Sequence, residues 1–91
     1  MIQSCRDKET EKLLNRIPSK KFHAIAEVAR IKLAFLNRAK DLRDLSLPSL
    51  RLEKLSGDRK GQYSNRINSQ YRICFIWSNG DAREVEITDY H

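Results

Sequence analysis

Apolar residues recur at helical spacing in two segments of the N-terminal half. In residues 7–16, Leu13 and Leu14 lie among glutamates and lysines, which predicts a short helix that stops before Pro18. Residues 19–42 predict a longer helix with Ser19 as its N-cap. Six of its apolar side chains return every three or four positions: Phe22, Ile25, Ala26, Ala29, Leu33 and Leu36. Three more widen this stripe, so the helix should lie against a broad surface such as a sheet: Val28, Ile31 and Phe35.

From Leu50 onward the apolar spacing changes from helical to alternating. A loop between two glycines, residues 56–61, precedes three predicted strands at residues 62–68, 71–77 and 82–90. Asn79-Gly80 predicts a tight hairpin between the last two strands. In the last strand Val85 and Ile87 should face one side and Glu84 and Glu86 the other, and residues 1–5 suggest a short edge strand. Helices followed by an antiparallel sheet predict one α+β domain over residues 1–91, with the helices covering one face of the sheet.

The central strand, residues 71–77, is apolar at nearly every position except Arg72. A link of three residues, 68–70, would pair Ile67 with Tyr71 and Arg66 with Arg72. In that register one face is apolar (Tyr63, Ile67, Tyr71, Ile73 and Phe75) and the other is mixed (Ser64, Arg66, Arg72 and Cys74). A two-residue link would mix charged with apolar side chains, so the three-residue link is favoured.

Two neighbouring arginines repel each other, and a shared phosphate would explain why both are present. The alternative is that acidic side chains bridge them, the candidates being Glu53, Glu84 and Glu86. Phe35, Phe75 and Trp77 are expected in the core rather than as platforms for stacking bases.

The composition favours an anionic partner, because the formal net charge is +6 and the pI is about 9.6. Cys5 and Cys74 lack the spacing of metal ligands and are expected to be buried, reduced thiols. We therefore expect neither a metal nor a cofactor. The first residues lack the order of a signal peptide, and no apolar run approaches the ~18 residues of a membrane span. A cytoplasmic protein with no membrane partner is expected.

Three motifs occur in order in the C-terminal half: LSGDRKG at residues 55–61, SNRINSQYRICF at residues 64–75, and DYH at residues 89–91. Together they resemble the HigB branch of the RelE/ParE-like toxins of bacterial toxin–antitoxin systems. The resemblance is strong over residues 50–91 and looser before them. It implies a microbial RNase fold, with two N-terminal helices packed on a twisted antiparallel sheet. It further implies an endoribonuclease that cuts mRNA in the ribosomal A site. Its partner would be a HigA-type helix-turn-helix antitoxin, and operator DNA would be bound only through that complex.

Metal-free RNA cleavage uses the 2′-OH as nucleophile and needs a base, an acid, and cations that stabilise the phosphorane. His91 suits the acid or base because its reference pKa of ~6.5 is near neutrality. A terminal carboxylate beside that imidazole would raise its pKa and favour the acid role. Tyr90 would bind the phosphate or stack on a base. Asp89 could orient the imidazole, although adjacent strand residues point to opposite faces.

The remaining predicted site residues are cations and one amide. Arg66 and Arg72 would hold the scissile phosphate, and further RNA contacts would come from Lys54, Arg59, Lys60 and Asn68. Some relatives carry lysine at the position of Ser56, arginine at that of Asn68 and histidine near Glu53. Lys54 and Arg66 could supply the positive charge that those residues provide in the relatives; otherwise the catalytic rate should be low. Glu53 is a candidate base, but pairing with a neighbouring arginine is its more ordinary role.

Two other functions fit parts of the sequence. A ParE-like relative would poison DNA gyrase without RNA chemistry, although such a role needs no terminal histidine. A basic RNA- or ribosome-binding protein could inhibit translation without catalysis. The basic face of the helix at residues 19–42 is either solvated or a docking face for antitoxin or RNA.

Overall fold

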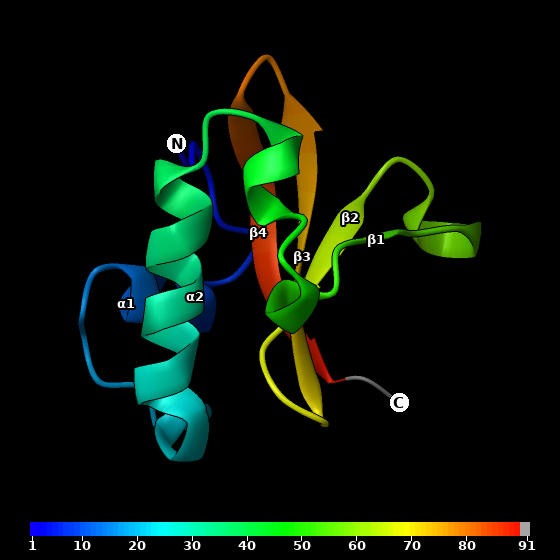
Figure 1. Cartoon of the computed structure of the whole chain (residues 1–91). Coiled ribbons are helices and arrows are strands. Elements are labelled where there is room, and N and C mark those ends of the chain that lie inside the picture. Colours follow the sequence, from blue (N-terminus) through cyan, green and yellow to red (C-terminus); the bar gives the residue numbers. More distant parts are fainter. Residues whose placement is uncertain (90–91) are drawn as a thin grey trace.

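A four-stranded antiparallel sheet carries two α-helices on one of its faces (Figure 1). The computed structural model describes residues 1–89, and Tyr90 and His91 lie outside the described residues. The strands follow one another across the sheet in sequence order: β1 (Glu53–Lys54), β2 (Tyr63–Arg66), β3 (Tyr71–Ser78) and β4 (Asp81–Asp89). The helices are α1 (Lys8–Leu14) and α2 (Ala26–Arg38). The predicted α+β class is therefore confirmed.

Helix α1 begins at Lys8 because the Asp7 side chain caps it, accepting a hydrogen bond of 3.1 Å from the Thr10 N–H. Thr10 is fully buried, and its hydroxyl oxygen accepts a hydrogen bond from the backbone N–H of Ile87 at 3.1 Å. Leu13 is buried one turn later. The cap and these two buried side chains therefore fix α1 against β4.

Helix α2 is shorter than the sequence predicts, because the chain enters it through a separate turn. The Ser19 hydroxyl caps that turn rather than α2: it accepts from the Phe22 N–H at 3.2 Å and donates to Glu9 at 2.7 Å. A 3₁₀ turn, His23–Ile25, then leads into α2 at Ala26. Burial of Phe22, whose ring is nearly perpendicular to that of Tyr71 with the ring centroids 5.8 Å apart, holds this entry against the sheet.

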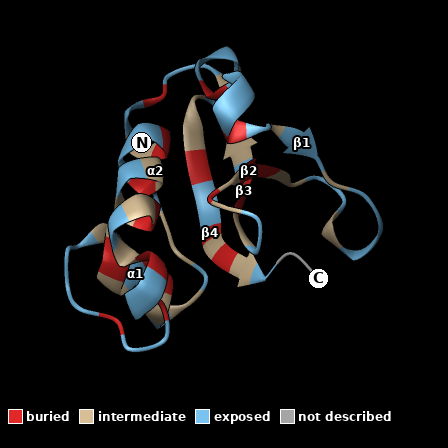
Figure 2. Cartoon of the chain, turned by 60° about the horizontal axis from the view of Figure 1, so that its bottom comes forward, coloured by how far each residue is buried: buried red, intermediate tan, exposed pale blue. Residues whose placement is uncertain are grey.

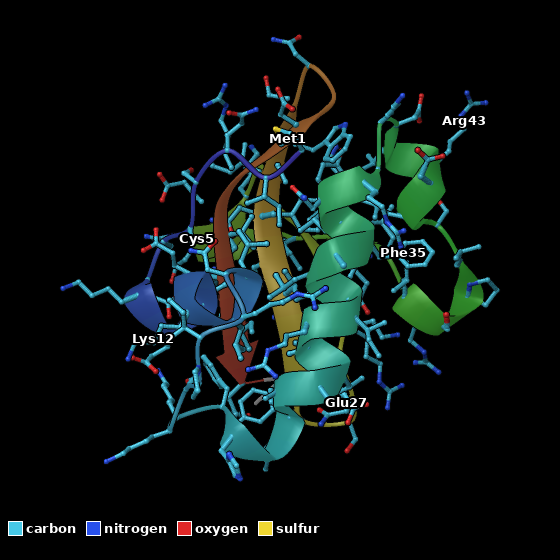
Figure 3. All side chains as sticks on the ribbon, turned by 90° about the vertical axis from the view of Figure 1, so that its left-hand side faces the viewer. Met1, Cys5, Lys12, Glu27, Phe35 and Arg43 are labelled. Atoms are coloured by element: carbon cyan, nitrogen blue, oxygen red, sulfur yellow. The ribbon has the colours of Figure 1, made fainter. Side chains whose placement is uncertain are left out.

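The apolar stripe of α2 is narrower than predicted. Ala29, Leu33 and Leu36 are completely buried, and Figure 2 shows the buried bands of α2 on the side of the helix that faces the sheet. Ile31 is 57% exposed and Phe35 36% exposed, so the prediction that Phe35 belongs to the core is wrong. Figure 3 shows Phe35 on the side of α2 that faces the short helical turns after it.

Those turns are η2 (Leu42–Leu45) and η3 (Pro48–Leu50), and a buried amide fixes both. The side-chain N–H₂ of Asn65 donates to the carbonyls of Leu45 at 3.4 Å and Leu50 at 3.5 Å. Pro48 begins the second turn. The alternating spacing that begins at Leu50 forms a strand only over Glu53–Lys54, which is not among the three strands predicted from the sequence.

The predicted pairing of the two central strands is confirmed. Arg66 lies opposite Arg72, and the Ile67 N–H donates to the Tyr71 carbonyl at 2.9 Å. The hairpin at Asn79-Gly80 is also confirmed, since both residues have the positive φ (52° and 78°) of the favoured two-residue turn.

Strand β4 contains a bulge that the sequence pattern does not indicate. The register shifts opposite residues 74–76 of β3, and Glu84 adopts a left-handed backbone with φ 53°. This extra residue places both Ala82 and Val85 in the core, although they are three positions apart. The expected N-terminal edge strand consists of two isolated parallel bridges, Ile2 to Ala82 and Cys5 to Val85.

Candidate functional site

The arginine pair lies on the sheet face opposite the helices. Arg66 on β2 and Arg72 on β3 are cross-strand partners, so their Cβ atoms lie about 5 Å apart. The Arg72 side chain is 22% exposed and Arg66 is half-buried. Two like charges therefore lie side by side and partly removed from water, which is unfavourable without an anion.

The three acidic candidates lie at different distances from the arginine pair. Arg72 Nη1 lies 4.0 Å from Glu53 Oε2, a loose ion pair with a carboxylate that is about half exposed. Glu86 instead forms a 2.8 Å ion pair with Arg59, and Glu84 lies exposed at the bulge. Of the three candidates, Glu53 is therefore the carboxylate that lies next to the arginine pair.

A cleft of about 150 Å³ opens beside the two guanidinium groups. Its lining contains three arginines, one carboxylate and two hydroxyls: Arg51, Arg66, Arg72, Glu53, Ser64 and Ser69. A water molecule occupies about 30 Å³ of the liquid, so the cleft has room for a phosphate group. Cationic donors and hydroxyls around a space of this size form a site for an oxyanion.

Sequence reasoning did not identify Arg51 and Ser69. A signal for Arg51 was present, because it stands two residues before Glu53, the spacing that places side chains on one face of an extended chain. Ser69 follows Asn68 in the link between β2 and β3. Its position at the cleft depends on how that link folds, which composition alone does not determine.

A second hollow of about 360 Å³ adjoins the cleft, because Glu53 and Arg72 line both. The other lining residues belong to β1 and the following loop: Lys54, Leu55, Ser56, Asp58 and Arg59. Two of the predicted cations, Lys54 and Arg59, are therefore brought near Arg72. Lys60 is exposed in the same loop and lines neither space.

Arg59 fastens this loop to the sheet. Its Nη1 donates to Glu86 at 2.8 Å and to the side-chain oxygen of Gln62 at 3.1 Å. The hydrogen bond to the Glu86 carboxylate raises the pKa of the Arg59 guanidinium above its usual value. The carboxylate offsets much of the charge that Arg59 was predicted to offer RNA, so the structural role is the better supported one.

Asn68 organises the three-residue link between β2 and β3. Its side-chain oxygen accepts from the N–H groups of Gln70 at 2.8 Å and Tyr71 at 2.7 Å. Its backbone carbonyl accepts from Arg66 Nε at 3.0 Å. Asn68 therefore positions Arg66, with its amide oxygen committed to the turn rather than facing a ligand.

Asp89 lies on the other face of the sheet from the arginine pair. It pairs with Tyr71, whereas Arg72 pairs with Thr88. The Asp89 carboxylate accepts from the Gln70 side chain at 3.2 Å and is exposed. The structure thus does not bring Asp89 together with Arg66 and Arg72. Two further predicted residues, Tyr90 and His91, lie outside the described residues.

The two cysteines are free and lie apart from one another. Cys74 is fully buried under the arginine face, with Sγ 3.4 Å from the Thr88 hydroxyl, while Cys5 is half-buried. In residues 1–89, no group of three or more His, Cys, Asp or Glu side chains could hold a metal ion. Over the same residues, no helix has the length and apolarity to cross a membrane.

Solved structures of bacterial toxins share this fold. The YoeB–YefM complex from Staphylococcus aureus superposes with a TM-score of 0.62 at 19% identity, covering 100% of this chain and 95% of the other. A mutant of YafQ from E. coli gives a TM-score of 0.64 at 13% identity, covering 99% of this chain and 92% of the other. The fold is therefore that of the RelE-like toxins.

The sequence assigns the chain to one family within this fold. A sequence model of the family described as "RelE-like toxin of type II toxin-antitoxin system HigB" matches residues 5–91. The chain belongs to this HigB family of RelE-like toxins.

Two curated relatives that are also named HigB match part of this chain. One is the Endoribonuclease HigB of Proteus vulgaris, 33% identical over 60 residues, which are 66% of this chain and 65% of the relative. Toxin HigB-1 of Vibrio cholerae serotype O1 is 44% identical over 52 residues, 56% of this chain and 55% of the relative. The matches thus span less than two thirds of either relative's length.

Proposed function

We propose that this protein is the toxin of a type II toxin–antitoxin system and that it is a metal-independent endoribonuclease, cleaving mRNA in the ribosomal A site. The observation that carries the proposal is the pair Arg66 and Arg72 at a cleft of about 150 Å³. Membership of the HigB family and the name of the Proteus vulgaris relative support the same activity.

In this mechanism the arginine pair binds the two non-bridging oxygens of the scissile phosphate. Two planar guanidinium groups suit this geometry and stabilise the extra negative charge of the phosphorane. The 2′-OH loses its proton to a base as it attacks phosphorus, which yields a 2′,3′-cyclic phosphate. The 5′-oxygen leaves with a proton from an acid, and so every proton is accounted for.

His91 is the proposed acid, and Tyr90 is the proposed contact to the phosphate or to a base. Glu53 is the group to test as the base, because it is a carboxylate at the cleft with Arg72 Nη1 4.0 Å away. Asp89 faces the other side of the sheet, so we propose that it acts on His91 indirectly, through the backbone at the end of β4. Lys54 supplies positive charge from the adjoining hollow.

The proposed partners follow from the family. A HigA-type helix-turn-helix antitoxin would neutralise the toxin, and the complex would bind operator DNA through the antitoxin. Two solved YoeB–YefM complexes share the fold of this chain, which supports an antitoxin partner. The substrate requires the protein to act in the cytoplasm, where ribosomes translate.

Primer extension on mRNA from a purified translation system tests the proposal. Wild-type protein should give discrete cuts at A-site codons, and Arg72→Gln and His91→Ala should abolish them while remaining folded. Inhibited translation with intact mRNA would indicate a non-catalytic ribosome binder. DNA breaks in cells that retain intact mRNA would indicate a gyrase poison. Either result would contradict the proposed nuclease.

A further inference from the structure

Three arginines form a row across the sheet face opposite the helices. Arg66 pairs with Arg72 between β2 and β3, and Glu53 pairs with Ser64 between β1 and β2. Continuing the second register by two residues brings Arg51 level with Arg66, on the same face as Glu53. Neighbouring strands lie about 4.8 Å apart, so the row spans about 10 Å with Arg66 at its centre. All three arginines line the same cleft.

Arg51 occupies the end of this row with a strained backbone. Its φ of 42° and ψ of 61° are left-handed, a conformation that glycine adopts freely and that a residue with a Cβ adopts at a steric cost. The chain is anchored on both sides, since Leu50 is buried and Glu53 is paired with β2. Strained residues persist where the surrounding structure fixes them, and they are concentrated at functional sites. The backbone of Arg51 is therefore a second observation that favours a role at the cleft.

The central and outer arginines offer different sets of donors. Arg66 donates from Nε to the Asn68 carbonyl at 3.0 Å, which fixes its orientation and leaves its Nη groups for a ligand. Arg51 is exposed, and within residues 1–89 its side chain makes neither a hydrogen bond nor an ion pair. The row thus presents oriented donors at its centre and a complete guanidinium group at its edge.

The size of the cleft favours one anion shared by the row. Its volume of about 150 Å³ is well below the ~300 Å³ of the smaller pockets that enclose a whole small-molecule ligand. The cleft therefore suits an anionic group such as a phosphate rather than a nucleotide with its base. Guanidinium groups that line one space of this size can donate to different oxygens of the same phosphate.

We propose that Arg51 is a third ligand of the scissile phosphate, which lies over Arg66 with Arg72 on one side and Arg51 on the other. This inference rests on the proposed function, because it takes Arg66 and Arg72 as the pair that binds this phosphate. Arg51 closes the outer side of the site and contributes affinity for the RNA strand.

A probe with a single phosphate tests this role without cleavage. The probe is a dinucleoside monophosphate with 2′-deoxy sugars, which lacks the nucleophilic hydroxyl, and its affinity is measured by amide chemical-shift titration. Arg51→Gln should weaken its binding roughly fivefold, as expected for one exposed ion pair. Arg51→Lys should restore only part of the affinity, because an ammonium cannot bind two oxygens in a fork.

Two further variants separate the role of Arg51 from general charge and from folding. Arg43→Gln removes an equal charge from an arginine that lines neither hollow and extends into solvent in Figure 3, so the affinity should be unchanged. Arg51→Gly should lose the same affinity as Arg51→Gln while keeping or raising the melting temperature, since glycine relieves the left-handed strain.

A longer probe tests whether the phosphate is shared. In a 2′-deoxy trinucleotide with two phosphates, Arg51→Gln should cost the same factor in affinity as in the single-phosphate probe. A loss seen only with the trinucleotide would overturn the proposal, since Arg51 would then meet a different phosphate from Arg66.

The remaining outcomes distinguish this inference from the proposed function. If Arg72→Gln loses the single-phosphate probe and Arg51→Gln binds it as tightly as wild type, the role of Arg51 is wrong and the proposed function stands. Equal losses in Arg51→Gln and Arg43→Gln would also overturn that role, since only general charge would matter. If wild-type protein binds neither probe at millimolar concentration, the phosphate cleft itself is wrong and the proposed function fails with it.

Discussion

Arg66 and Arg72 face each other across neighbouring antiparallel strands, and Arg72 Nη1 lies 4.0 Å from Glu53 Oε2. Like charges directly opposite on a sheet destabilise it. A bound anion removes this cost, so the folded protein should gain stability from oxyanions at the cleft.

We predict that inorganic phosphate raises the melting temperature of wild-type protein and that Arg72→Gln abolishes the increase. Without phosphate, the free energy of unfolding of this variant should stay within about 1 kcal/mol of wild type, since the repulsion from Arg66 is lost together with the loose pair to Glu53. Arg72→Lys should restore only part of the response, because an ammonium cannot bind two oxygens in a fork. Differential scanning fluorimetry measures this, and an undiminished response in Arg72→Gln would contradict the site.

Substitution of Arg59 tests whether this residue stabilises the fold or contacts RNA. Its 2.8 Å ion pair with Glu86 holds the loop at residues 55–62 on the sheet. Arg59→Gln should lower the free energy of unfolding by about 1 kcal/mol, a typical value for a partly exposed charged hydrogen bond. RNA cleavage by the folded variant should be reduced far less than in Arg72→Gln. Urea denaturation and cleavage assays measure the two effects. A variant that keeps wild-type stability but loses cleavage would instead make Arg59 a phosphate ligand.

Asn68 should separate stability from RNA binding. Asn68→Ala removes the acceptor of two backbone hydrogen bonds and should cost about 1 to 2 kcal/mol of unfolding free energy. Asn68→Asp keeps an acceptor in the same place and should retain most of that stability. The new negative charge beside Arg66 should nevertheless weaken oligonucleotide binding. If both variants are equally stable, the turn does not depend on the side-chain oxygen.

The stability of the folded protein should depend on the ionisation of the Cys5 thiol at alkaline pH. Burial, with smaller contributions from Glu11 and Asp7, raises the pKa of the Cys5 thiol from 9.0 to about 11. The folded state thus holds this proton more tightly than the unfolded state. Its contribution to stability is complete below pH 9.0 and is lost as the pH rises toward about 11.

Comparison of wild type with Cys5→Ala isolates this effect from the titration of lysines and tyrosines. We predict that wild-type stability, measured by urea denaturation, falls more steeply than that of Cys5→Ala between pH 9.0 and about 11. Parallel curves over this range would show that the thiol titrates normally in the folded protein.

The pairing of β2 with β3 was predictable because apolar and polar side chains alternate along both strands, which strongly limits the possible registers. Only the three-residue link separates the apolar face from the face with Arg66 and Arg72, and that register is observed. The Asn79-Gly80 hairpin was predictable for a local reason, since these residue types tolerate the positive φ of the turn.

Tertiary contacts explain what the sequence pattern did not predict. Ser19 has the chemistry of a helix N-cap, but its hydroxyl caps the Phe22 turn and binds Glu9, so α2 begins later. The bulge at Glu84 could not be predicted from the residue type, because glutamate rarely adopts a positive φ. Arg51 lines the cleft next to Leu50, whose carbonyl accepts from Asn65, a contact between distant positions that no local pattern indicates.

The single-turnover rate of mRNA cleavage on programmed ribosomes tests the central claim most directly, with melting temperatures recorded in parallel. Arg43→Gln serves as the matched control for loss of one arginine outside the cleft. The account predicts that Arg72→Gln cleaves about 100-fold more slowly or worse, the usual cost of removing a donor to transition-state charge, while Arg43→Gln cleaves at the wild-type rate. Cleavage by folded Arg72→Gln at the wild-type rate would contradict the assignment of the arginine pair to the scissile phosphate.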